Sequence, residues 1–160
     1  MRLSPELRGH IGLGIKILVG VLALALIGEK SGQLEHLDFT VGDAWANVRV
    51  IFAFWLTILA PGFYLCALWA LGAFFTKSRS DDEFGPAMVK SLRETGQDLL
   101  IGAAAAILVE PVFSVWLTEG FRGVRVSLEI EDVTIAFIGA AIFLLAETGK
   151  RLRGELEQFV

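Results

Sequence analysis

Glu110 is the side chain of this sequence best placed for chemistry, because it interrupts an apolar segment in the stretch AILVEPVFSVW. A carboxylate at membrane depth is costly to bury and marks a functional hypothesis by default. We therefore interpret Glu110 as a candidate relay for protons or cations. The alternative is a structural ion pair with Arg49, since an antiparallel run of the two segments would bring both residues to a similar depth.

Three more ionisable residues lie in or beside apolar segments: Lys16, Asp98 and Glu147. Lys16 stands near the inner end of the first segment, where its long side chain can extend to the interface. It can also pair with Asp98 or Glu147, which reach a similar depth. We interpret these three residues, like the pair of Arg49 and Glu110, as candidates for intramembrane ion pairs.

Constellations typical of enzymes or metal sites are missing from the sequence. The topology argued below places His10 and His36 on opposite sides of the membrane, and neither has a Cys or a second His at ligand spacing. The single cysteine, Cys66, excludes a disulfide framework. No glycine-rich phosphate loop or activated nucleophile is recognisable, and the net charge of −4 argues against nucleic acid as a direct ligand. We therefore expect no enzyme activity, no cofactor and no metal.

The elements that must position these residues are apolar helices. The 160 residues are 54% hydrophobic and 20% charged, with a mean hydropathy of +0.63, as in integral membrane proteins. A helix of about 20 apolar residues crosses the hydrocarbon layer. The sequence predicts an all-α integral membrane protein, with four transmembrane helices in one antiparallel bundle that forms a single domain, 1–160. The helices are expected at about 11–28, 48–76, 86–118 and 133–148.

Lysine and arginine are distributed unevenly between the two sides of this bundle. With the N-terminus inside, nine lie on the cytoplasmic flanks and four on the outer flanks. Because cytoplasmic loops carry an excess of these residues, both termini are expected in the cytoplasm. The loop 77–93 and the tail 149–160 are then cytoplasmic.

The two outer loops show alternation at period two, which is typical of short strands. In LEHLDFTV the apolar positions are Leu37, Phe39 and Val41, and in RGVRVSLEI they are Val124, Val126, Leu128 and Ile130. The two loops are therefore expected to form either a small two-stranded β cap or irregular loops at the interface.

The cytoplasmic loop contains an amphipathic stretch, SDDEFGPAMVKSLRETG. Pro86 suits the first turn of a helix, where its missing N–H costs little. From there one face carries Met88 and Leu92, and another carries Lys90 and Arg93. Together with Phe84, these residues predict a docking face for a protein partner. The alternative is that the apolar side chains pack against the inner ends of the neighbouring helices.

Two sets of residues resemble a known family. Phe84, Leu92 and Gly96 match one signature by their spacing, and Gly149, Leu152, Glu155 and Val160 are similar to its C-terminal motif. The chain thereby resembles the bacterial membrane protein family known as domain of unknown function 2975. The four-segment plan and the length are similar as well.

The resemblance implies a location in the bacterial inner membrane and no established catalytic activity. Members of this family are often accompanied by a small helix-turn-helix regulator, so the expected function is that of a membrane partner or regulator that docks such a cytosolic protein. The alternative is a small oligomeric transporter or channel that uses Glu110, with kinks at Pro61 and Pro111. The small pair Gly102 and Ala106 is compatible with a homo-oligomer.

Overall fold

All regular structure in the described part of the chain is helical, as the sequence predicts. The computed structural model describes residues 5–32, 34, 44–77, 86–119, 126 and 128–157. The elements are α1 (Pro5–Ser31), α2 (Ala44–Lys77), α3 (Pro86–Ala104), the π-helical segment η2 (Ala105–Val109), α4 (Glu110–Glu119) and α5 (Ile130–Glu157).

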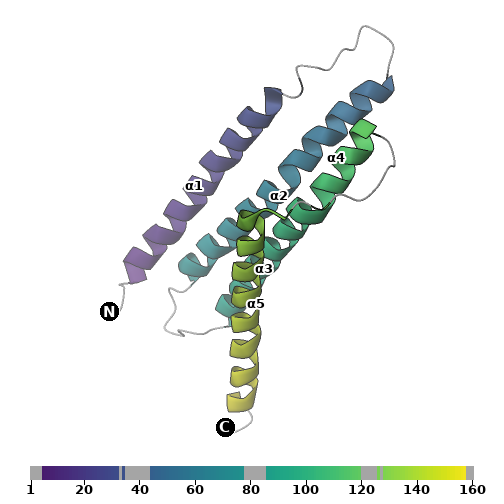
Figure 1. The fold of residues 1–160 in the computed structure, drawn as a ribbon. Helices are drawn as coiled ribbons and strands as arrows, with labels where there is room; N and C mark the ends of the chain where they lie inside the picture. Colours follow the sequence, from purple (N-terminus) through teal and green to yellow (C-terminus); the bar gives the residue numbers. More distant parts are fainter. Residues whose placement is uncertain are drawn as a thin grey trace.

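The helices pack mainly in chain order. α1 lies along α2, α2 along α3, and α3 along α5, while α3, η2 and α4 follow one another without a break (Figure 1). The start of α1 and the end of α5 lie towards the same end of the molecule (Figure 1). α5 begins beside the middle of the other helices and extends past the start of α3.

Three helical segments are long and apolar enough to cross a membrane: Gly9–Ser31, Ala44–Thr76 and Met88–Leu117. Large apolar side chains point outward from them, among them Leu24 with 73% of its surface exposed. Such exposure suits a lipid environment, because lipid tails are as apolar as these side chains. The predicted fourth segment, 133–148, lies within α5 and includes Glu147, but α5 is not among the helices found long and apolar enough to cross a membrane in the described part of the chain, so four transmembrane helices are not confirmed.

The predicted β cap is not confirmed. Most of its first strand, 35–41, lies outside the described residues. In the second, Val126 and Leu128 carry no regular secondary structure, and Ile130 is already the first residue of α5. Glu131 and Asp132 in the first turn of α5 explain the helix, because their negative charges stabilise a helix N-terminus.

The two intramembrane prolines have different effects on their helices. α2 continues as one helix through Pro61. At Pro111 the chain first passes through η2, whose wider turn is closed by the N–H of Glu110 donating to the carbonyl of Ala105. Proline has no N–H to donate to the residue four positions earlier and clashes with that carbonyl, which accounts for a π-helical turn directly before it. Such turns occur frequently at functional sites.

Glycines allow the closest helix contacts. A Cβ atom added to Gly96 would lie 2.7 Å from the backbone nitrogen of Phe143 and 2.9 Å from the carbonyl oxygen of Gly139, so α3 and α5 touch through their backbones. α1 and α2 meet in the same way, since a Cβ at Gly12 would lie 2.8 Å from the carbonyl oxygen of Gly72. Close approach at small residues is how membrane helices gain van der Waals contact.

One buried polar residue strengthens the contact between α2 and α3. Thr95, only 3% exposed, donates its hydroxyl to the carbonyl of Ser91 at 2.9 Å, and the carbonyl oxygen of Ala67 in α2 lies 3.5 Å away. The hydroxyl therefore keeps a partner within its own helix while it faces the next one.

We expect Gly96→Ala to lower the free energy of unfolding by about 1–3 kcal/mol, the usual cost of overpacking a tight contact. Gly20→Ala is the matched control, because no atom lies within 4 Å of its added Cβ and alanine is the better helix former. Thermal unfolding in detergent measures both. Equal melting temperatures for the two variants would contradict the backbone contact.

Candidate functional site

Glu110 lines a polar cavity of about 780 Å³ that is bordered by α1, α2, α4 and the start of α5. Among the described residues that line it, the acidic ones are Glu29, Glu110, Glu129, Glu131 and Asp132, and Lys30 is the one basic residue. Tyr64, Thr57 and Ser114 add hydroxyl groups. The apolar helices thus enclose a cavity large enough for water, and its described lining carries more negative than positive side chains.

The position of Glu110 follows from the local backbone. It is the first residue of α4, directly after η2, so the wider π-helical turn sets the direction from which its side chain reaches the cavity. Within the described residues, its carboxylate has no hydrogen bond or ion pair. Lys30 is the positive charge that interacts with it, and Asp132 and Glu129 are the nearby like charges. An ionisable residue at membrane depth that lines a cavity is a candidate for a proton or cation relay.

Tyr64 connects three helices at the edge of this cavity. Its hydroxyl donates a hydrogen bond of 3.2 Å to Oδ1 of Asp132, which joins α2 to the start of α5. Its ring lies against Gly102 of α3, where an added Cβ would come within 2.5 Å of a ring carbon. The hydroxyl of a buried tyrosine usually finds such a partner, and here the partner fixes the first turn of α5.

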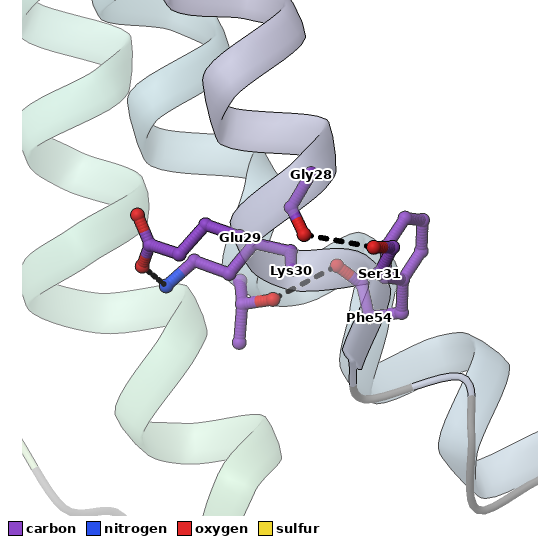
Figure 2. A network of polar contacts seen from close by, with 6 residues as sticks. Gly28, Glu29, Lys30, Ser31 and Phe54 are labelled. Carbon is purple, nitrogen blue, oxygen red and sulfur yellow. Dashed lines mark hydrogen bonds and ion pairs between the residues drawn. The ribbon is translucent and has the colours of Figure 1, made fainter.

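Lys30 lines the cavity from the end of α1, and Figure 2 shows its side chain beside that of Glu29. Lys30 Nζ lies 3.0 Å from Oε1 of its neighbour Glu29, and its side chain is only 27% exposed. The hydroxyl of Ser31 donates to the carbonyl of Gly28 at 2.8 Å, which satisfies one carbonyl of the last turn of α1. In α2, the hydroxyl of Thr57 donates to the carbonyl of Phe54 at 3.0 Å.

The carboxylates are spread over the cavity wall. In the described part of the chain, no group of three or more His, Cys, Asp or Glu side chains is placed to share a metal ion. A cavity of this kind attracts protons and hydrated cations through its overall charge.

Arg49 is not among the residues that line the acidic cavity. Its guanidinium group stands over the ring of Trp45, 5.9 Å from the centroid, and it lines a second cavity that does not include Glu110. Thr57, the first cavity residue of α2, is eight positions further along, about 12 Å of helix. Among the described residues no ion pair joins Arg49 to Glu110, so the structural alternative for Glu110 receives no support.

Lys16 contacts an aromatic ring. Its ammonium group lies 5.3 Å from the centroid of Trp69, and its side chain runs beside Gly72. Asp98 and Glu147, its predicted partners, are half-buried on α3 and α5, whereas the helix of Lys16 packs on α2. A cation–π contact therefore takes the place of the predicted ion pair within the described residues.

The predicted docking residues lie at the start of α3, except Phe84, which is outside the described residues. Met88 and Leu92 are half-buried, and Lys90 is exposed with its ammonium group 3.7 Å from Glu94. Arg93 is exposed and lies over the ring of Phe143 in α5, 5.7 Å from the centroid. The charged face predicted from the sequence is thus exposed, and the apolar face packs partly inward.

Tyr64, Asp132 and Lys30 are among the site residues that the sequence analysis does not propose. Tyr64 is the single tyrosine of the chain and stands within an apolar run, which signals a hydroxyl in need of a partner. Asp132 follows the stretch interpreted as a strand, and Lys30 directly follows the first apolar segment, where it is one of the four basic residues on the outer flanks.

No family model matches this chain, and no curated protein or solved structure is detectably similar to it. The resemblance described above therefore rests on the quoted residues, and function must be argued from geometry and charge.

A double-mutant cycle of Tyr64→Phe and Asp132→Ala tests the link between α2 and α5. We expect a coupling energy of about 1 kcal/mol, the usual net value of such a hydrogen bond, in thermal or chemical unfolding in detergent. Tyr64→Phe combined with Glu131→Ala is the control, because Glu131 lines the same cavity without a hydrogen bond to Tyr64. Strict additivity in both cycles would refute the link.

Proposed function

We propose that the chain is a membrane protein of the bacterial inner membrane whose cytoplasmic end docks a small soluble protein. The observation that carries this proposal is that α3 packs along α5 and that both helices expose basic residues there. The resemblance supplies the class of partner, a helix-turn-helix regulator. Docking would hold such a regulator at the membrane, and this chain itself would not contact DNA.

The α3–α5 pair is suited to a docking surface because it is rigid. The backbone contact of Gly96 with Gly139 and Phe143 holds the two helices together, and Arg93 over Phe143 adds a contact nearer the end. α5 then continues past the start of α3 (Figure 1). A rigid surface loses little conformational entropy when a partner binds.

The charge of this end favours an acidic partner surface. Among the described residues, its exposed basic side chains are Lys90, Arg93, Lys150 and Arg151. Glu94 offsets one of these charges through its ion pair with Lys90. A regulator contacts DNA through a basic face, so an acidic patch would lie on another part of its surface. Attraction between that patch and the basic end of α3 and α5 would steer docking and leave the DNA-reading face free.

The topology completes the proposal. α1, α2 and the continuous α3–α4 segment cross the membrane, and α5 returns the chain to the cytoplasm as a fourth helix of an antiparallel bundle. The excess of basic residues on one side supports this orientation. The acidic start of α5 lies at the polar cavity, which would hydrate carboxylates that could not face lipid.

Co-purification from native membranes tests the docking function. We expect the wild-type chain to retain a stoichiometric DNA-binding protein, and the triple variant Lys90→Glu, Lys150→Glu, Arg151→Glu to lose it. Arg93 is left unchanged because it contacts Phe143. Exposed changes of this kind alter stability by only about 0.5 kcal/mol, so thermal unfolding should stay close to that of the wild type.

The matched control keeps the charges, with Lys90→Arg, Lys150→Arg and Arg151→Lys, and should retain the partner. Equal recovery of the same protein by the charge-reversed variant would place the docking surface elsewhere. Recovery of no DNA-binding protein by the wild type would exclude the regulator function.

A second candidate function is passage of protons or cations, favoured by the position of Glu110 in an acidic cavity beside Tyr64 and Asp132. Four helices enclose little space, so this function requires a homo-oligomer.

Flux in proteoliposomes tests this candidate. We expect Glu110→Gln to reduce proton or cation flux at least about tenfold if the carboxylate carries the ion, the change expected when an interaction of about 1.4 kcal/mol is lost. Glu147→Gln is the control, because Glu147 is a half-buried glutamate outside the cavity. Wild-type vesicles with no flux above empty vesicles would exclude the transport function.

A further inference from the structure

A second cavity, of about 510 Å³, lies between α2 and α4. It differs from the acidic cavity in the residues that form its wall and in the sign of their charge. Its lining is Trp45, Val48, Arg49, Phe52, Phe113, Trp116 and Leu117. Six of these seven side chains are apolar or aromatic, and Arg49 is the one charged group among them. None of the described lining residues carries a carboxylate, so none of them repels an anion.

Edge-to-face ring contacts build the wall across the two helices. The ring of Phe52 in α2 lies 5.5 Å from that of Phe113 in α4, at an interplanar angle of 62°. Phe113 in turn lies 6.0 Å from Trp116, at 82°. These are the geometries that aromatic pairs prefer, so the apolar wall is formed by side chains that support one another.

Arg49 supplies a positive charge at the end of this wall. It is exposed, its guanidinium group stands over the ring of Trp45, and no carboxylate in the described part of the chain pairs with it. A guanidinium group presents a rigid set of donors that matches two phosphate oxygens. The stacking on Trp45 orients those donors and leaves them available for an anion.

The position in the chain identifies the kind of ligand. Trp45 and Arg49 belong to the first part of the membrane-length segment Ala44–Thr76, and Trp116 to the last part of Met88–Leu117. Tryptophan is enriched where a membrane helix meets the headgroup layer. The arginine therefore lies near the level of lipid headgroups, and the apolar wall continues towards the hydrocarbon.

We propose that this cavity binds an anionic phospholipid, with the phosphate group on Arg49 and an acyl chain along Phe52 and Phe113. Charge complementarity selects an anionic headgroup, because Arg49 is the single charged residue in the described lining. The apolar wall selects a lipid over a free anion, because a soluble phosphate would leave this surface without a partner. The site is separate from the acidic cavity and from the docking surface of α3 and α5.

Lipid titration of the detergent-solubilised chain tests the proposal. The probes are phosphatidylglycerol and phosphatidylcholine with identical acyl chains, and the readouts are lipid retention in native mass spectrometry and the shift of the melting temperature. We expect the wild type to bind phosphatidylglycerol about tenfold more tightly than phosphatidylcholine, the difference expected from one charge-assisted hydrogen bond. Arg49→Gln should reduce this preference to within about twofold.

Two variants serve as controls. Lys16→Gln removes another cation that lies over a tryptophan, Trp69, and should keep the full preference. Arg49→Lys keeps the charge but loses the two-pronged donor geometry, so its preference should be intermediate.

Three results would overturn the proposal: equal binding of both lipids by the wild type, an unchanged preference in Arg49→Gln, or an equal loss of preference in Lys16→Gln. Inorganic phosphate alone, added at the same concentration, should leave the melting temperature unchanged. A shift equal to that with phosphatidylglycerol would identify a free anion as the ligand and also overturn it.

Discussion

The contact of backbone against backbone at glycines is the constraint on which the remaining structure depends. Helices in lipid gain little from the hydrophobic effect when they associate, so close approach must supply the attraction. Gly12 with Gly72 aligns α1 with α2, and Gly96 with Gly139 aligns α3 with α5. Each contact fixes how far one helix is shifted along the next. Those shifts decide which polar residues share a level, and they place Lys30, Tyr64, Glu110 and Asp132 around one cavity.

The same alignment separates charges of opposite sign. The acidic cavity collects carboxylates from α1, α4 and α5, whereas Arg49 lies beyond it on α2 within an aromatic wall. Each arrangement offers a way to tolerate charge near lipid. The carboxylates share a space that water can enter, and Arg49 rests on the face of Trp45. Neither arrangement needs a buried ion pair, whose desolvation often costs as much as the pairing gains.

The helices could be predicted from the sequence because apolar length and helix-start signals are local properties. Pro86, for example, begins α3 as expected. The alignment between helices could not be predicted, because the sequence of an apolar segment does not indicate how deep each residue lies in the membrane. The proposed pair of Arg49 and Glu110 assumed equal depth, and the structure separates the two residues into different cavities. The link of Tyr64 to Asp132 joins residues 68 positions apart. It depends on the glycine contacts, which no periodicity reveals.

α5 contributes residues to both the acidic cavity and the proposed docking surface. Its first turn carries Asp132, held by Tyr64 at the cavity, and its last turns carry Lys150 and Arg151 at the proposed docking surface. A helix of 28 residues is about 42 Å long and moves largely as one body. The contact of Gly139 with Gly96 lies between these two ends and has no room to slide. The two candidate sites therefore lie towards opposite ends of one helix, on either side of its close contact with α3.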